Sequence, residues 1–136
     1  MNMPNISIKG KEYQYDERDV ILFTEGLIGL PGMRRAVLIP MAEYAPFCWL
    51  ASTEDERNRF IVVDPTLIYA DYQPRMPEIF DGTDLKLLVI VKISSDWEQT
   101  TVNLRAPLFI NPEAKKGAQV ILSESRYGLA ESLPLN

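Results

Sequence analysis

Histidine and cysteine, the side chains behind most nucleophilic and metal chemistry in proteins, are almost missing from this chain of 136 residues. It has no histidine and one cysteine, Cys48. These counts exclude Ser-His-Asp and Cys-His catalysis, histidine-bound zinc or iron, an intrachain disulfide and a CxxC redox pair. Cys48 lies between Phe47 and Trp49 with no basic neighbour in sequence to favour a thiolate. We therefore interpret Cys48, and Trp49 beside it, as core residues.

Carboxylates are the remaining candidates for acid–base or metal chemistry. The run Glu54-Asp55-Glu56 matches no calcium or magnesium loop in its spacing, and we interpret it as a solvated turn. Asp64 follows the apolar run Phe60–Val63 and would be a general base in a small hydrolase if a second carboxylate faced it. The candidates for that second carboxylate are Asp71, Asp81 and Asp84. An Asp-Pro pair after a strand is also a frequent turn initiator, and we favour that role for Asp64.

The string Gly26-Leu27-Ile28-Gly29-Leu30-Pro31-Gly32 is rich in glycine but is not a nucleotide-binding loop. Its spacing differs from GxGxxG, and neither a helix pattern nor a Lys-Ser pair follows it. We expect a compact loop with a tight turn at Pro31-Gly32. Leu27 and Ile28 must then be buried, or else form an exposed apolar patch that a partner can cover.

An asparagine stands inside an apolar strand pattern in the string Asn103-Leu104-Arg105-Ala106-Pro107. Its amide must find hydrogen-bond partners there. We predict that Asn103 bonds to the backbone at a bulge, and that the strand bends at Pro107, which has no N–H to donate.

Short apolar runs separated by prolines and glycines predict an all-β fold. No helical periodicity is sustained, and only short helical turns at Pro77–Phe80 and Pro112–Lys116, the second closed by Gly117, are expected. Strands at this spacing favour a small, partly closed antiparallel β-barrel in one domain over residues 1–136, with flexible tails at 1–10 and 128–136. The expected strands are Lys11–Tyr15, Val20–Phe23, Ala36–Ile39, Phe47–Ala51, Phe60–Val63, Leu87–Ile93, Thr100–Arg105, Leu108–Ile110 and Gln119–Leu122.

The core of this barrel is predicted from the apolar residues inside those strands. They are Phe23, Leu38, Phe47, Leu50, Phe60, Val62, Leu88, Ile90, Leu104, Ile110 and Ile121.

The charge is acidic and unevenly spread. The net charge is −5, and most of the excess acid lies in Glu12–Glu25 and Asp64–Glu98. An acidic chain does not favour direct nucleic-acid binding, but an acidic face can steer a basic protein partner. Trp97, in a polar turn, can add an apolar anchor to such a face. The carboxylates that we expect to contact this partner are Asp71, Glu78, Asp81 and Asp84.

No targeting or membrane-spanning segment is recognisable. The first residues lack the apolar run of a signal peptide, and the longest apolar stretch, Leu87–Val91, is too short to cross a bilayer. We expect a cytoplasmic protein, a monomer on its own, without a cofactor, a metal or a membrane partner.

Five strings, in this order and spacing, resemble the FliW family of flagellar assembly factors. The resemblance runs from about Val20 to Tyr127, and the one departure is Met33, where the family usually has phenylalanine after Gly-Leu-Pro-Gly. The strings are Phe23–Gly32, Pro46–Ser52, Phe60–Pro65, Asn103–Pro107 and Gln119–Leu122.

This resemblance implies a non-enzymatic protein that binds flagellin before export. It also implies that, when flagellin is absent, the protein binds the translational regulator CsrA and relieves repression of flagellin mRNA. We hypothesise that flagellin binds through apolar and backbone contacts, made by Leu27, Ile28, Asn103, Leu104 and Pro107. We hypothesise that the basic regulator binds to the acidic face that includes Trp97. The alternative function is the carboxylate-dependent hydrolase.

Overall fold

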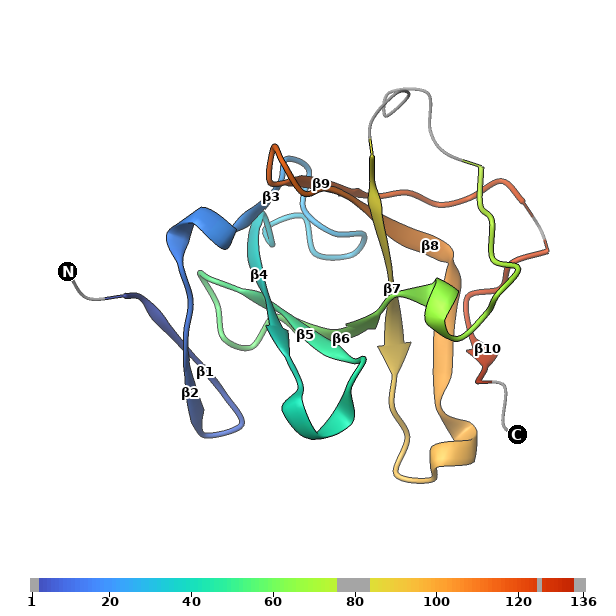
Figure 1. Ribbon diagram of the computed structural model, residues 1–136, viewed down its shortest axis with the longest axis horizontal. Helices are drawn as coiled ribbons and strands as arrows, with labels where there is room; N and C mark the ends of the chain where they lie inside the picture. The colour runs from blue at the N-terminus through green and yellow to red at the C-terminus, as the bar shows by residue number, and fades with distance from the viewer. Residues whose placement is uncertain (1–2, 76–83, 125, 134–136) are drawn as a thin grey trace.

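The computed structural model describes residues 3–75, 84–124 and 126–133, and it is all-β with short 3-10 turns. The main strands surround one apolar interior, and Figure 1 looks into this barrel. Its strands are β3 (Ile21–Phe23), β4 (Arg35–Pro40), β5 (Cys48–Ser52), β6 (Arg59–Val63), β7 (Lys86–Lys92), β8 (Thr101–Asn111) and β9 (Lys116–Gln119).

The barrel is closed. Antiparallel pairing runs without interruption from β3 to β9, and β9 then pairs with β3 in parallel, through Leu22 with Lys116 and Phe23 with Gly117. The predicted all-β barrel is confirmed. The closing parallel pair joins residues far apart in sequence, which periodicity along one strand cannot reveal.

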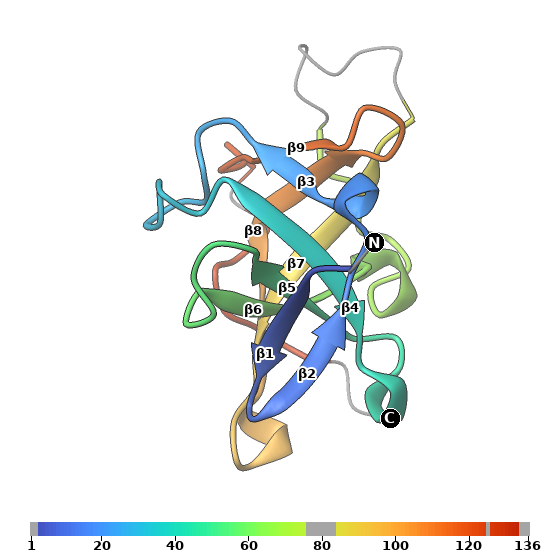
Figure 2. The same ribbon diagram turned by 90° about the vertical axis from the view of Figure 1, so that its left-hand side faces the viewer.

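Alternation along β4 divides its side chains between two apolar clusters. Ala36 and Leu38 face the barrel interior, whereas Val37 and Ile39 point outward. The outward side chains are covered by a hairpin of β1 (Asn5–Ile8) and β2 (Lys11–Gln14), which lies in front of β4 in Figure 2. Residues 5–8 were expected in a flexible tail, but they form β1. Their side chains Ile6 and Ile8 are buried in the same cluster as Val37 and Ile39.

The opposite outer face of the barrel, formed by β6, β7 and β8, is covered as well. Val63, Val89 and Val102 point outward there and pack against the connection after β6 and the C-terminal arm, which we define as residues 120–133. The arm ends in β10 (Glu131–Ser132), which pairs with the start of β8. Residues 131 and 132 had been expected in the tail 128–136. The chain therefore has one apolar cluster inside the barrel and one on each of two outer faces, which the hairpin and the C-terminal arm cover.

The predicted core residues are buried or half-buried with one exception. Ile121 is 61% exposed, and that expectation is wrong. After β9 the N–H groups of Val120 and Leu122 donate to Pro107 O and Arg105 O. This alternating pattern turns Leu122 inward and Ile121 to the solvent.

The short helix expected at Pro112–Lys116 is also wrong, whereas Pro77–Phe80 lies outside the described residues. The Asn111 side chain accepts the N–H groups of Glu113 and Ala114, both at 3.1 Å, and thereby forms a turn. Lys115 completes it with a left-handed φ of 56°. Gly117 is consequently no helix cap: it lies in β9, where an added Cβ would be 2.6 Å from Phe23 Cε1.

Candidate partner-binding site

A bulge in β8 organises the surface that holds several predicted contact residues. Ile90 of β7 pairs with Asn103, but Leu88, two residues earlier, pairs with Leu108, so β8 has extra residues at 104–107. The amide N–H groups of Arg105 and Ala106 donate to Asn103 Oδ1, at 3.1 and 3.0 Å. The prediction that the Asn103 side chain bonds to the backbone at a bulge is confirmed. The bulge also turns Leu108 into the barrel, whereas Leu104 faces outward.

Gln119 connects this bulge to the glycine-rich loop. Its Nε2 donates to Ala106 O at 3.1 Å, and its Oε1 accepts the Ile28 N–H at 2.8 Å. The loop itself is fixed by two reciprocal backbone bonds between Leu27 and Leu30. Leu27 is 3% exposed and packs in the core, whereas Ile28 is 50% exposed. Of these two predicted contacts, only Ile28 offers its side chain to a partner.

The outer side of the bulge is pinned by the C-terminal arm. Gly128 O accepts the N–H groups of Leu104 and Arg105, and Tyr72 OH donates to Leu104 O at 2.6 Å. Tyr127 lies edge-on to Tyr72, with ring centroids 4.7 Å apart. Burial raises the pKa of Tyr72, so its hydroxyl remains a neutral donor. Leu104 and Pro107 are buried, so their side chains support the bulge and are not offered to a partner.

A hollow of about 250 Å³ beside these tyrosines brings Asp71 and Leu104 together. Arg126 and Glu131 from the C-terminal arm also line it. Arg126 forms an ion pair with Glu124 (2.9 Å), and Glu124 Oε1 accepts the Arg75 N–H. The hydrogen bond from the Arg75 N–H lowers the pKa of the Glu124 carboxyl most. The hydrogen bond from the Arg126 side chain lowers it further. The hollow is therefore polar and of mixed charge.

The remaining predicted contacts are dispersed. Trp97, 45% exposed, lies in the 3-10 turn Trp97–Gln99 after β7, edge-on to Phe47 with ring centroids 6.1 Å apart. Asp84 is exposed just before β7, at the opposite end of that strand (Figure 1). Glu78 and Asp81 lie outside the described residues. Phe47, which contacts Trp97, packs against the same outer cluster as Tyr72, the neighbour of Asp71 in the chain.

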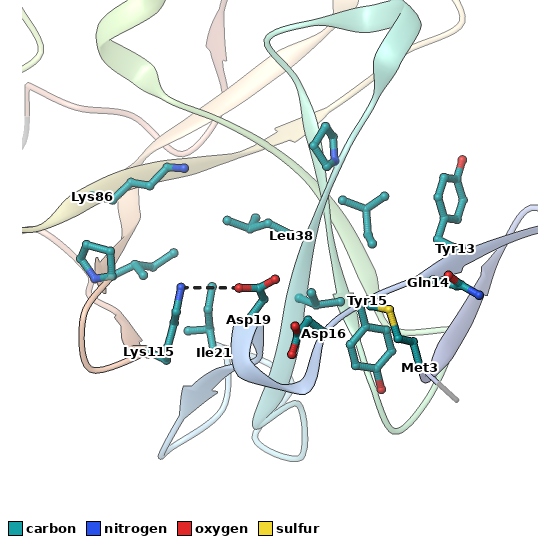
Figure 3. A pocket seen from close by; sticks show the side chains of 15 residues that line it. Met3, Tyr13, Gln14, Tyr15, Asp16, Asp19, Ile21, Leu38, Lys86 and Lys115 are labelled. Atoms are coloured by element: carbon teal, nitrogen blue, oxygen red, sulfur yellow. Dashed lines mark ion pairs between the residues drawn. The ribbon is translucent and has the colours of Figure 1, made fainter. Parts of the chain in front are cut away.

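A second, wider hollow of about 600 Å³ opens between the hairpin and the barrel mouth (Figure 3). Its floor is apolar, with Ile21, Leu38 and Ile110. Both carboxylates at its rim have basic partners: Asp19 faces Lys115 at 3.9 Å, and Asp16 binds Arg18 through both oxygens. The Arg18 side chain holds the pKa of Asp16 down at about 2. Both rim carboxylates are thus held in ion pairs.

Two of the carboxylates considered for catalysis or metal binding, Asp64 and Asp55, have structural roles. Asp64 Oδ1 accepts the N–H and the hydroxyl of Thr66, at 2.9 and 2.7 Å, and caps the turn Pro65–Leu67. Asp55 similarly binds Arg57. Within the described ranges no three metal-ligating side chains gather. Burial raises the pKa of Cys48, which is half-buried against the barrel interior. None of these groups supports the hydrolase alternative.

Gln119, Tyr72, Tyr127 and Gly128 were missed by the sequence reasoning. Each acts through a partner distant in the chain, as when Gln119 joins position 28 to position 106. Gly128 contributes only a carbonyl oxygen, which any residue has. Of these four residues, only Gln119 has a sequence feature that indicates a role, because it is a polar residue at the start of the apolar run Val120–Leu122.

In the part of the chain that the structure covers, no helix has the length and apolar character needed to cross a bilayer. Taken together, the fold and the site define a small closed β-barrel whose bulged strand is connected through Gln119 to a loop that exposes Ile28.

Comparison with known proteins agrees with that class. The family model described as "FliW protein" matches residues 7–133, and the chain belongs to this family. A flagellar assembly factor FliW from Caldicellulosiruptor bescii is 34% identical over 125 residues, covering 87% of this chain and 82% of the relative. One from Clostridium beijerinckii is 32% identical, covering 90% and 92%. A crystal structure of the flagellar assembly factor FliW superposes with a TM-score of 0.86 at 25% identity, covering 97% of this chain and 99% of that one.

Proposed function

We propose that this flagellar assembly factor works in the cytoplasm by binding flagellin, and that in the absence of flagellin it binds CsrA and relieves repression of flagellin mRNA. The observation that carries the proposal is the β8 bulge, which fixes an exposed apolar side chain, Ile28, through Gln119. A rigid apolar surface of this kind suits an assembly factor, whose partner is another protein chain.

Flagellin is proposed to bind at the glycine-rich loop and the start of the C-terminal arm. Ile28 is half exposed, and Ile121, two residues after Gln119, is 61% exposed. An amphipathic helix buries its apolar face against such side chains. The bulge contributes rigidity here, and its buried Leu104 and Pro107 do not contact the partner.

Replacing Ile28 and Ile121 with glutamate is expected to weaken flagellin binding by about tenfold or more, because a carboxylate cannot be buried against an apolar helix face. The measurement is isothermal titration with purified flagellin. Leu67→Glu is the control: this side chain is 64% exposed, in the turn Pro65–Leu67 after β6. Unchanged affinity in the double variant, or an equal loss in the control, would refute this surface.

CsrA is proposed to approach the face that holds Asp71 and Trp97. A protein that binds RNA must present basic groups, and an acidic surface raises its association rate. Trp97 and Phe47 add an apolar contact that surface charges alone do not provide.

Reversing Asp71 and Glu98, the exposed carboxylate beside Trp97, to lysine is expected to slow association with CsrA by about tenfold at low salt, because surface charges steer encounter. The control reverses Glu12 and Glu25, which changes the net charge equally; both are exposed residues outside that face. Stopped-flow association at several salt concentrations measures the rates. Equal slowing in both double variants would show that net charge alone acts, and no salt dependence would rule out electrostatic docking.

A further inference from the structure

On one surface of the described part of this acidic chain, several cations lie close to aromatic rings. Trp49 is half-buried on the outer face of β5, where it packs against the apolar cluster under the β1–β2 hairpin. Lys9 Nζ lies 5.8 Å and Arg59 Cζ 5.7 Å from the centre of the Trp49 ring. Lys11 Nζ lies 5.4 Å from the centre of the Tyr13 ring. The rings hold the three cations in place by cation–π attraction.

A groove of about 330 Å³ lies between the hairpin turn and the 3-10 turn Ala42–Tyr44, and Arg59 reaches it only by its contact with the Trp49 ring. Lys9, Lys11, Tyr13 and Trp49 form one side of the groove. The other side has Met41, Ala42, Glu43 and the exposed Tyr44. The groove thus combines apolar contact area with positive charge.

The charges in the groove are not neutralised by neighbours. Among the described residues, no ion pair within 4.0 Å involves Lys9, Lys11 or Arg59. Arg59 donates instead to a backbone carbonyl, Glu56 O, and Glu43 is the acid that lines the groove. The surface is locally positive although the chain carries −5 overall.

The hairpin turn holds Lys9 in an unfavourable backbone conformation. The β1–β2 connection is a two-residue turn, with φ of 51° at Lys9 and 81° at Gly10. Asparagine or glycine suits such a left-handed first position better than lysine does. A lysine at this position places its ammonium over Trp49 at a small cost in stability.

We propose that this groove binds an acidic segment of a protein partner. The carboxylates of the segment pair with the ammonium and guanidinium groups of Lys9, Lys11 and Arg59. An apolar side chain of the segment packs on Tyr44 and Met41. The groove lies on the hairpin side of the barrel, away from the β8 bulge (Figure 1), so the proposal stands apart from the flagellin surface.

The chemistry of the groove favours a peptide over single-stranded RNA, the other class of polyanion. RNA binds such surfaces by stacking its bases on aromatic rings. Here Trp49 and Tyr13 already carry cations, which a base would have to displace. A long polyanion is also repelled by the net negative chain, whereas a short acidic segment meets only the local charge.

The test uses the Trp97→Phe protein, in which Trp49 is the one remaining tryptophan and reports the groove by its fluorescence. The probe is a peptide of alternating glutamate and tyrosine, titrated at low salt. We expect Lys9→Asn with Lys11→Gln to weaken binding about tenfold through the loss of two cations. Asparagine favours the turn, so the unfolding temperature is expected to stay level or rise.

The matched control is Lys92→Gln with Lys116→Gln, which changes the net charge equally at exposed lysines outside the groove. This control is expected to bind the peptide as the parent does. Equal weakening in both variants, no fluorescence change with the peptide, or tighter binding of oligouridylate than of the peptide would each overturn the proposal.

Discussion

Replacing Gly26 with alanine is expected to lower the free energy of unfolding by about 3 kcal/mol, from left-handed backbone strain and steric overlap together. Gly26 has a φ of 71°, a conformation that alanine rarely adopts. Its added Cβ would overlap the carbonyl group of Pro31 and lie 2.7 Å from Leu30 O. Both obstacles are backbone atoms, which cannot rotate away as a side chain would. Urea unfolding followed by fluorescence measures the loss.

Gly29→Ala separates the two causes. Gly29 has a φ of 84°, but its added Cβ would meet no atom within 4 Å. We expect a loss of about 1 kcal/mol, from backbone strain alone. If both variants lose the same free energy, crowding at Gly26 contributes nothing and the account of the loop is wrong.

Replacing Asn103 with alanine is expected to cost about 2 kcal/mol, the penalty for leaving a buried backbone donor without a partner. The Ala106 N–H would lose its acceptor, whereas the Arg105 N–H keeps a 3.2 Å bond to Gly128 O. Because the bulge fixes the Ile28 surface through Gln119, flagellin affinity is expected to fall as well.

Aspartate at position 103 is the matched variant, because it supplies an oxygen where Asn103 Oδ1 accepts both N–H groups. Asn103→Asp is therefore expected to keep most of the stability that alanine loses. Denaturant midpoints of the three proteins, compared at neutral pH, decide the matter. Equal losses for alanine and aspartate would mean that the hydrogen bonds of Asn103 do not hold the bulge.

Features that depend on neighbours in the sequence could be predicted. Asn103 and Pro107 together indicated the bulge, because an amide needs partners and proline lacks an N–H. The inner strands followed from short apolar runs, and their residues Phe23, Leu50 and Val62 are fully buried. In each case the chemical requirement and the residues that satisfy it lie within one short segment.

Features that depend on distant pairing could not be predicted. Nothing in Lys116–Gln119 indicates that it lies parallel to β3, and nothing near Ile28 indicates the Gln119 side chain. The exposure of Ile121 depends on which residues of the C-terminal arm bond to the bulge, and a shift of one residue would have buried it. Whether Leu27 or Ile28 faces solvent was likewise decided by the fold of the loop.

The closing pair between β3 and β9 also has a consequence for synthesis of the protein. The chain emerges from the ribosome N-terminal end first, so β3 exists long before its partner at Lys116–Gln119. Until then one side of the growing sheet is an unpaired edge, which can associate with other chains. Because long-range pairing is slow, the nascent protein passes through an interval in which chaperone capture competes with barrel closure. The Ile28 surface forms only at the end of that interval, since Gln119 belongs to the last strand of the barrel.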